Sequence, residues 1–504
     1  MDIWKLLNTP IRELFVQKKE EPPPKTQSRR YDGALTGRLT ADWVTSSTSA
    51  DSELLSSLRQ LRNRSRDLVR NNDYARGAVR TIVNNVVGKG IRLQSQVKKR
   101  RGKQLLDEAT NTAIEEAWIN WQKAKYCHTA GTLCFQDIER LIVRSVIESG
   151  EVLIRLISKS FDGSPVPLAL EVIEADQLYD DFSSGKALVV GDKRIRMGIE
   201  MDEWKRPVAY WCYRNHPGDY QFSGSNRSDE LVRIPAEEIL HLYVCDRPGQ
   251  TRGVPWLHST LQRLRNVGGY EEAELIAARA QAAVMGFIES PEPASTLADD
   301  STPTENLRSL EPGAIELLAP GEKFSGFAPT RPGNGFDPFI KLMLRGVATG
   351  IGMSYEALAR DLSEVNYSSA RIGMLDDRDN WRILQQWLIS NFHLKVFERW
   401  LDLAVLSGVL DLPNYELNPQ AYCCPKFTPR GFDWVDPAKE INASKEAIRA
   451  GLSTLSNELA AKGIDVEELL EERRRELDLA QALNLNFDTD PAITNPETVS
   501  VVES

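Results

Sequence analysis

Residues that could hold a nucleotide phosphate are present in this 504-residue chain, but their spacing is wrong for that chemistry. A P-loop needs a glycine five residues before its Gly-Lys pair. For Gly88–Lys89 that position holds Val83, and for Gly185–Lys186 it holds Asp180. The sequence therefore does not favour ATP hydrolysis by this chain.

Cysteine and histidine residues do not form a metal-binding pattern either. Cys127, His128 and Cys134 lie close together, but no Cys-x-x-Cys pair or spaced pair of histidines completes a tetrahedral ligand set. Six scattered cysteines are no disulfide framework, so we expect reduced thiols in a cytosol-like compartment. The vicinal pair Cys423–Cys424 could be redox-active, although a structural role is favoured. The sequence therefore predicts no metal and no cofactor.

Recognisable catalytic motifs are missing as well. No Gly-x-Ser-x-Gly occurs, and none of the five histidines stands in a nucleophile motif. His241 is expected to be a packed strand residue. Acidic residues are abundant, but a sequence cannot pair two carboxylates in space, so a metal-dependent nuclease or terminase component stays open as an alternative. We predict that the chain is not an enzyme.

Charge is distributed unevenly along the chain. Residues 1–103 carry 22 Lys and Arg against 10 Asp and Glu, whereas residues 104–504 carry 40 against 62. The basic first segment could contact nucleic acid or an acidic partner, or could be a solvated arm. The acidic majority disfavours tight static DNA binding, in which each neutralised phosphate adds affinity.

Two features of the sequence bear on location. No stretch approaches the roughly 18 consecutive apolar residues that span a membrane. The first residues lack the apolar core and the small-residue cleavage site of a signal peptide. We therefore expect a soluble protein that is made inside the cell and has no membrane partner.

The patterns of the first half indicate an α+β body behind a flexible arm. Residues 1–52 form the arm, because E-E-P-P-P-K at 20–25 breaks any helix. Apolar spacing predicts helices over 54–87, 105–124 and 135–149. Segments rich in β-branched and aromatic residues then predict strands at 152–157, 168–173, 195–201, 208–213 and 239–244.

The run D-R-P-G-Q-T-R-G-V-P at 246–255 opens the most informative part of the chain. A helix is predicted over 256–289, followed by a Pro-punctuated module with short strands at 315–318 and 323–327, and a second helix over 337–351. Small residues in the first helix and the pair Gly346 and Gly350 in the second suit close packing, within the chain or between subunits. Two helices that bracket a small module are typical of a channel wall rather than a catalytic pocket.

Helical patterns dominate the rest of the chain. Residues 353–367 break the preceding helix, and a long helix is predicted over 368–409. Helix begins again at Asp436–Pro437, an N-cap followed by proline at the first helical position. Gly463 and Asp465 separate the last two helical pieces, and residues 485–504 are expected to be a flexible tail.

Several sequence blocks, in this order and spacing, resemble the portal proteins of lambda-like tailed bacteriophages. The resemblance covers about residues 50–480 and leaves out both tails. Its blocks are R-D-L-V-R-N-N-D-Y-A-R-G-A-V-R-T-I-V-N-N-V-V-G-K-G-I-R (66–92), S-G-E-V-L-I-R (149–155), L-E-V-I-E-A-D-Q-L (170–178), I-P-A-E-E-I-L-H-L-Y (234–243), D-R-P-G-Q-T-R-G-V-P-W-L (246–257) and Y-S-S-A-R (367–371).

The resemblance implies a portal fold that assembles as a ring, typically a dodecamer, at one capsid vertex. Its implied regions are an α+β wing (53–255), a first stem helix (256–289), a small α/β clip (290–336), a second stem helix (337–352), a tunnel loop region (353–367), a wing crossing helix with a return strand (368–435) and a helical crown (436–484).

The implied function is a channel for packaging and ejecting double-stranded DNA. The implied partners are copies of the chain, the terminase large subunit at the clip, major capsid and scaffold proteins, and head-tail connector proteins. Assembly would take place in the host bacterial cytoplasm, and the product would be part of the virion. A head-tail adaptor that does not conduct DNA is the main alternative.

Candidate contact residues follow from this implied plan. A DNA conduit needs weak contacts, so an acidic lining with a few spaced cations suits it. The DNA-channel candidates are Lys341 and Arg345 on the second stem helix, with Arg360, Asp361 and Glu364 in the loop. The candidates for binding a partner at the clip are Lys323 and Arg331. Each could instead be an ordinary exposed charge.

Overall fold

A computed structural model describes residues 34, 37–99, 106–179, 188–190, 193–219, 231–283, 286–289, 323–326, 335–363, 366–432, 437–462, 464–483 and 485. The chain divides into two compact units, Met1–Ser49 and Ala50–Ser504. The expected strand at 315–318, most of the expected clip, residues 1–33 of the arm and residues 486–504 of the tail lie outside the described residues.

The described part of the first unit holds one short helical turn, Arg38–Thr40. The backbone N–H of Gly37 donates to the Thr40 hydroxyl at 2.9 Å. Across the described part of the chain, no helix has the length and apolar character needed to cross a lipid bilayer.

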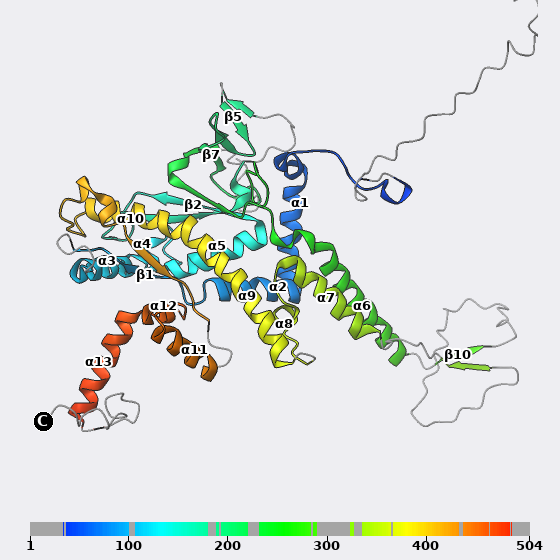
Figure 1. The fold of residues 1–504 in the computed structure, drawn as a ribbon. Coiled ribbons are helices and arrows are strands. Elements are labelled where there is room, and N and C mark those ends of the chain that lie inside the picture. Colours follow the sequence, from blue (N-terminus) through cyan, green and yellow to red (C-terminus); the bar gives the residue numbers. More distant parts are fainter. Residues whose placement is uncertain are drawn as a thin grey trace, which may run out of the picture. The chain divides into compact units, whose positions relative to one another are not determined.

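The second unit combines helices and antiparallel sheets, so the expected α+β class is confirmed (Figure 1). Its α-helices among the described residues are α1 (Ala50–Asn71), α2 (Asp73–Val86), α3 (Glu108–Trp121), α4 (Ala124–Cys127), α5 (Phe135–Ser149), α6 (Leu261–Ala283), α7 (Phe336–Ile351), α8 (Tyr355–Ala359), α9 (Tyr367–Leu388), α10 (Leu394–Leu406), α11 (Pro437–Arg449), α12 (Leu455–Ala460) and α13 (Val466–Ala482). Short 3₁₀ turns are η4 (Ala175–Gln177), η5 (Ala236–Glu238), η6 (Trp256–Ser259), η8 (Tyr415–Leu417) and η9 (Pro419–Ala421).

Each strand pair in the sheets of the second unit is antiparallel. One sheet has the order β3-β2-β9, with β2 (Glu151–Ile157), β3 (Ala169–Ile173) and β9 (Ile239–Tyr243). A second has the order β4-β5-β6-β7-β8, with β4 (Leu188–Val190), β5 (Lys193–Arg196), β6 (Ile199–Met201), β7 (Pro207–Tyr213) and β8 (Leu231–Pro235). Two further pairs are β1 (Arg92–Ser95) with β12 (Pro425–Thr428), and β10 (Gly286–Glu289) with β11 (Lys323–Gly326).

Two predicted elements are each divided into two by a local change of backbone conformation. The expected helix over 54–87 is two helices, because Asn72 is extended and its side chain accepts the backbone N–H of Ala75 as an N-cap. The expected strand over 195–201 is a hairpin, because Met197 and Gly198 both adopt positive φ and turn the chain. The predicted helix over 135–149 is confirmed as α5.

The largest hydrophobic core contains a cluster of aromatic rings. Trp118 of α3 contacts Phe135 of α5, Phe397 and Trp400 of α10 and Phe427 of β12, with ring centroids 5.0–6.5 Å apart. These contacts join helices that are far apart in sequence into one packed body. The expected long helix over 368–409 is confirmed as α9 and α10, with a π-turn (η7, Ile389–His393) between them.

The helix expected over 256–289 is shorter than predicted. Its first turn, Trp256–Ser259, is 3₁₀, and α6 ends at Ala283. Residues 286–289 are not helical but form β10, whose register pairs Gly286 with Gly326 and Glu289 with Lys323. Gly286 disfavours a helix, whereas Phe287 and Ile288 are residue types that favour a strand. The pairing of β10 with β11 therefore outweighs the helical spacing of the apolar residues.

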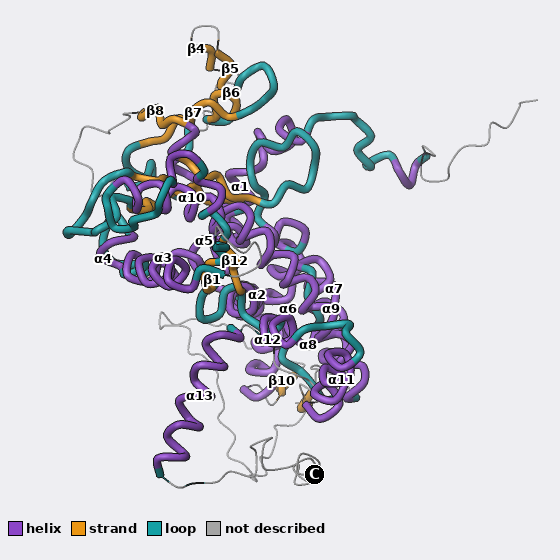
Figure 2. Tube along the Cα trace, turned by 60° about the vertical axis from the view of Figure 1, so that its left-hand side comes forward, coloured by secondary structure: helices purple, strands orange, loops and turns teal. Residues whose placement is uncertain are grey.

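Helices α6 and α7 pack side by side and antiparallel (Figures 1 and 2). A Cβ built on Gly346 would lie 1.6 Å from Nη1 of Arg263, and one on Gly350 would lie 2.4 Å from Cγ2 of Thr260. The two glycines of the Gly-x-x-x-Gly spacing therefore serve a helix contact within the chain, one of the two alternatives that the sequence left open.

The same hairpin is closed further along by aromatic rings. The ring of Tyr270 on α6 stacks on Phe336 at 5.6 Å and meets Phe339 edge-on at 4.9 Å, both on α7. The contacts with α7 extend from Thr260, just before α6, to Tyr270 within it. The two helices therefore form one rod rather than two independent helices.

The entry to this rod depends on a close approach of two backbones. A Cβ on Gly253 would lie 2.1 Å from the carbonyl oxygen of Gly150, and one on Gly150 would lie 2.6 Å from the carbonyl carbon of Val254. Gly150 also has a φ of +91°, which strongly favours glycine. The segment before α6 can therefore lie directly against the end of α5 only because both positions lack a side chain.

We predict that Gly253→Ala destabilises the protein by about 2 kcal/mol or more, because the new methyl group collides with backbone that cannot move aside. The measurement is the urea dependence of unfolding, followed by circular dichroism. The matched control is Gly269→Ala within α6, where a Cβ meets nothing within 4 Å. The control should leave stability unchanged or raise it by up to about 1 kcal/mol. Equal stability of the two variants would contradict the steric argument.

Candidate functional site

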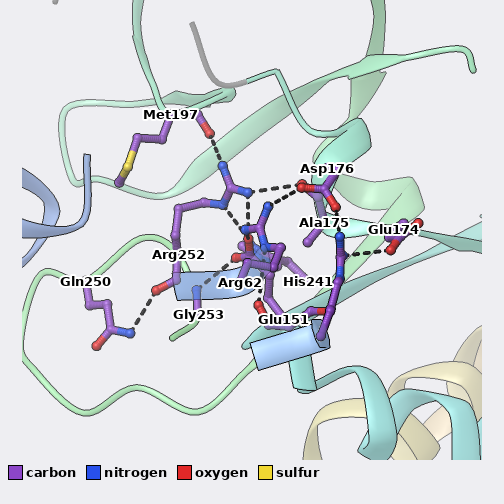
Figure 3. Close-up of polar contacts among 12 residues, drawn as sticks. Arg62, Glu151, Glu174, Ala175, Asp176, Met197, His241, Gln250, Arg252 and Gly253 are labelled. Carbon is purple, nitrogen blue, oxygen red and sulfur yellow. Dashed lines mark hydrogen bonds and ion pairs between the residues drawn. The ribbon is translucent and has the colours of Figure 1, made fainter. Parts of the chain in front are cut away.

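A buried cluster of charges lies where the segment 246–255 leaves the strand β9 and enters α6 (Figure 3). We define this junction clamp by its residues, Arg62, Glu151, Asp176, His241, Arg252 and Gly253. They come from α1, β2, η4, β9 and the segment itself. Sequence positions almost 200 residues apart are thus brought to one point.

The carboxylate of Glu151 is the centre of the junction clamp. Its Oε1 accepts hydrogen bonds from Nη2 of Arg62 and Nε of Arg252, both at 2.8 Å. Its Oε2 accepts the backbone N–H of Gly253 at 2.8 Å and lies 3.0 Å from Nε2 of His241. The Arg62, Glu151 and Arg252 side chains are fully buried, so the charge is neutralised by neighbours rather than by water.

The two arginines use their remaining donors on the surrounding backbone. Arg252 donates to the carbonyl oxygens of Met197 at 2.9 Å and Ala175 at 3.2 Å. Arg62 donates to the carbonyl oxygen of Ser149 at 3.3 Å. Because a guanidinium carries five N–H donors in a fixed fork, each arginine ties several chain segments together.

The carboxyl groups of the junction clamp are held in their ionised form. Burial acts to raise the pKa of Glu151, but Arg252, His241 and Arg62 outweigh it and hold that pKa well below its usual range. Burial likewise opposes ionisation of Asp176, and Arg62 and Arg66 lower its pKa overall. An ionised, ion-paired carboxylate without access to solvent suits a structural role and not proton transfer.

A second carboxylate holds the same segment. Oδ1 of Asp51, in the first turn of α1, accepts from both the backbone N–H and the hydroxyl of Thr251 at 2.9 and 3.0 Å. Its Oδ2 pairs with Arg196 of β5 at 3.0 Å. Together with the junction clamp, this fixes consecutive residues just before α6.

Asp176 of the junction clamp also belongs to a group of three possible metal ligands. Ligand atoms of Glu174, Asp176 and His216 lie within 4.8 Å of one another. Arg66 already pairs with both carboxylates, at 2.7 Å from Glu174 and closely with Asp176. A guanidinium therefore supplies the positive charge that a cation would otherwise bring, so we assign no metal to these residues.

Three of the predicted DNA-channel candidates, Lys341, Arg345 and Asp361, lie near one another on α7 and in the loop after α8. Nζ of Lys341 pairs with Asp337 at 2.9 Å, and its side chain is only 16% exposed. The guanidinium of Arg345 lies 5.5 Å above the ring of Tyr355 in α8. The hydroxyl of that tyrosine donates to Oδ2 of Asp361 at 3.2 Å. The structure therefore links the two cations of α7 to the loop after α8.

The other predicted residues are placed separately. Arg360 is exposed, ends α8 and adopts a left-handed conformation with a φ of +56°. Lys323 is exposed in β11. Glu364 and Arg331 lie outside the described residues. The expected break after the preceding helix is confirmed, because α7 ends at Ile351, and Ser354 then caps the short helix α8.

Sequence reasoning missed the contacts of the junction clamp and, among the residues around α8, it missed Tyr355. His241 was expected only as a packed residue, whereas it also lies against Glu151. Glu151, Arg252 and Gly253 stand inside the blocks S-G-E-V and Q-T-R-G-V-P, which signalled a family pattern but no partner. Nothing in the sequence singled out Tyr355. Its partners, Arg345 and Asp361, lie in two different elements that only the fold brings together.

Comparison with known proteins gives a family match. The sequence model described as "Phage portal protein, lambda family" matches residues 36–385. The probable portal protein of Halomonas phage phiHAP-1 is 33% identical over 477 residues, which covers 92% of this chain and 89% of the relative. Portal protein B of Escherichia phage lambda is 23% identical, with 90% of this chain and 91% of the relative covered. The match runs from before α1 into α9.

Solved structures give a weaker likeness. A chain in the neck of an empty gene transfer agent particle has a TM-score of 0.42 and 13% identity, and it covers 82% of this chain and 94% of its own length.

We predict that Glu151→Gln lowers the free energy of unfolding by about 3–5 kcal/mol, because it removes the buried carboxylate that pairs with both Arg62 and Arg252. Urea unfolding at pH 7 measures this loss. The control is Glu237→Gln, an exposed residue of η5, which should stay within about 0.5 kcal/mol of the parent. A parent-like Glu151→Gln variant would show that the junction clamp contributes nothing.

The same variant changes how stability depends on pH. The folded-state pKa of Glu151 and of Asp176 lies below the unfolded value of about 4. The unfolded chain therefore takes up protons first, and stability falls as pH decreases below about 5. In Glu151→Gln this fall should be shallower, because one of the two groups no longer titrates.

Proposed function

The chain belongs to the lambda family of phage portal proteins, and on this basis we propose that its copies form a ring, typically of twelve, through which double-stranded DNA enters and leaves the capsid. Family membership carries this proposal, because the match spans most of the chain. Portal proteins are structural, so the chain is a non-enzymatic component of the virion.

We propose how the helices, strands and residue ranges of the chain correspond to the regions of a portal. We assign residues 53–255 with 368–435 to the wing, α6 and α7 to the stem, residues 290–336 to the clip and residues 436–484 to the crown. The antiparallel packing of α6 against α7 supports the assignment of the stem, since a channel wall needs a stiff rod. Arms 1–52 and 485–504 receive no role.

Exposed apolar side chains on the rod support assembly into a ring. Leu275 and Ile276 of α6 are 51% and 57% exposed, and Phe339 and Leu342 of α7 are 43% and 65% exposed. Such residues need cover, and a neighbouring rod would provide it. In a closed ring each copy meets its neighbours through two different faces, so two helices with outward apolar residues suit a heterologous contact.

The junction clamp gives the rod a fixed base. Its hydrogen bonds hold residues just before α6 against α1, β2 and β9. A channel that transmits force from a DNA-moving motor needs such a joint between its wing and its stem. We propose that this is why fully buried charges occur at this position.

Weak DNA contact is assigned to charges on α7 and in the loop after α8. We propose that Lys341, Arg345, Arg360, Asp361 and Glu364 face the DNA channel. The cations would attract phosphate while nearby acids, among them Asp337 and Asp361, keep the contact short-lived. The guanidinium of Arg345 lies over an aromatic ring, a contact with which phosphate can compete.

The partners of the proposed ring follow from its position in the head. We propose that Lys323 and Arg331 contact the terminase large subunit and later head-tail connector proteins at the clip. The wing and crown would meet major capsid and scaffold proteins at the capsid vertex, after assembly in the host bacterial cytoplasm.

Purified full-length chain is expected to form rings with an axial opening wide enough for duplex DNA. Negative-stain electron microscopy with mass determination measures this directly. Rings with a closed centre would favour a non-conducting adaptor instead. A uniform monomer at high protein concentration, also in the presence of scaffold protein, would contradict the proposal.

Charge reversal at two positions within α7 is expected to impair DNA handling without preventing assembly. Lys341→Glu with Arg345→Glu replaces attraction for phosphate by repulsion, so packaged DNA per particle should fall several-fold while rings still form. The matched control is Lys395→Glu with Arg399→Glu, two exposed cations at the same spacing on α10. Full particles from the α7 variant, counted by nuclease-protected DNA, would refute the assigned contacts.

A further inference from the structure

We propose that Tyr355 is a positioning residue that fastens the loop Arg360–Ser363 to α7 and thereby makes stem and loop move together. The contacts that carry this proposal lie in α7, α8, the loop and α9. Only the statement that this loop faces DNA rests on the proposed function. The positioning role itself stands on geometry within one chain.

The first step concerns the helix that carries Tyr355. α8 has only five residues, so it cannot be stable without outside contacts. Its N-cap, Ser354, donates through its backbone N–H to Oδ1 of Asp377 at 2.8 Å and through its hydroxyl to Oδ2 at 2.5 Å. Asp377 belongs to α9 and is 2% exposed. The beginning of α8 is therefore fixed to the long helix α9.

The second step is that Tyr355 reaches two elements at once. Its ring lies under the guanidinium of Arg345, 5.5 Å away, and its hydroxyl donates to Asp361 at 3.2 Å. Burial, followed by the Asp361 carboxylate, raises the pKa of the Tyr355 hydroxyl. The hydroxyl therefore stays protonated at neutral pH and remains a donor.

The third step is that Asp361 organises the loop itself. Its Oδ1 accepts the backbone N–H and the hydroxyl of Ser363 at 3.0 and 2.6 Å, which leaves Oδ2 for Tyr355. The Ser363 hydrogen bonds, with Tyr355 and the charge of Lys341, hold the pKa of Asp361 below its usual range. A single ionised carboxylate thus shapes the loop with one oxygen and anchors it with the other.

The left-handed backbone conformation of Arg360 sets the direction in which the chain leaves α8. Its backbone N–H still donates to the carbonyl oxygen of Glu356 at 2.8 Å, and its positive φ of 56° then turns the chain out of α8. Asp361 is the next residue, and its side chain accepts the hydrogen bond from the Tyr355 hydroxyl. Tyr355 therefore holds the loop in the direction that Arg360 sets.

The two contacts of Tyr355 differ in strength. A hydrogen bond to a carboxylate is stronger than a cation–π contact at an exposed site. The hydroxyl should therefore hold the loop, while the ring sets how closely α7 follows it. In the proposed channel, a phosphate that draws Arg345 away from the ring would loosen α7 from α8 but leave the loop in place.

The test measures how readily the loop opens. Trypsin cleaves after arginine, and Arg360 stands at the start of the loop. In the purified full-length chain, Tyr355→Phe removes only the hydroxyl, and we expect the initial rate of cleavage after Arg360 to rise about tenfold. Mass spectrometry of the 361–504 fragment measures this rate.

The matched control is Tyr415→Phe, which removes another hydrogen bond from a tyrosine hydroxyl to a carboxylate, 2.6 Å from Asp402. It should leave cleavage after Arg360 unchanged. Asp361→Asn should speed cleavage as Tyr355→Phe does, and the double variant should add little, because both remove one link. An unchanged rate in Tyr355→Phe, or an equal rise in Tyr415→Phe, would overturn the proposal.

This readout uses neither DNA nor ring formation. If the chain forms no ring while Tyr355→Phe still speeds cleavage, the proposed function fails and the positioning role stands. If rings form and conduct DNA but the cleavage rates stay equal, only the positioning role fails.

Discussion

The buried carboxylate of Glu151 is the constraint on which the rest of the structure depends. A charge removed from water must be neutralised and hydrogen-bonded where it lies. Here its partners come from Arg62, His241, Arg252 and Gly253, on three further segments of the chain. None of these segments can move without leaving a buried charge or donor unpaired, so α1, β2, β9 and the entry to α6 are fixed relative to one another.

From this point a continuous series of contacts leads through the molecule. The junction clamp sets the start of α6, and α6 packs against α7 through Gly346 and Gly350. Arg345 joins α7 to α8, and Ser354 joins α8 to Asp377 of α9. Physical continuity alone does not prove energetic coupling. It does identify side chains through which the α+β body and the rod of α6 and α7 could influence each other.

The sequence predicted the features that depend on neighbouring residues and missed those that depend on residues far apart along the chain. Helices over 135–149 and 337–351 were predicted well, because apolar spacing is a local property. The strand at 286–289 was not, because only its pairing with 323–326 decides it. Lys341 and Arg345 were named as candidates on the predicted helix over 337–351, whereas Tyr355 and the partners of Glu151 depend on contacts across the fold.

Burial divides the charged residues of this portal protein into two functional groups. Breaking a fully buried pair such as Arg252–Glu151 costs about 3–5 kcal/mol, so evolution can use it only where the geometry must never change. Exposed ion pairs contribute about 0–1 kcal/mol and exchange readily with water or phosphate. Residues that meet DNA in transit must belong to the second group, because a strong contact would stop movement. The contact of Arg345 with the ring of Tyr355 belongs to the second group as well, because Arg345 is exposed.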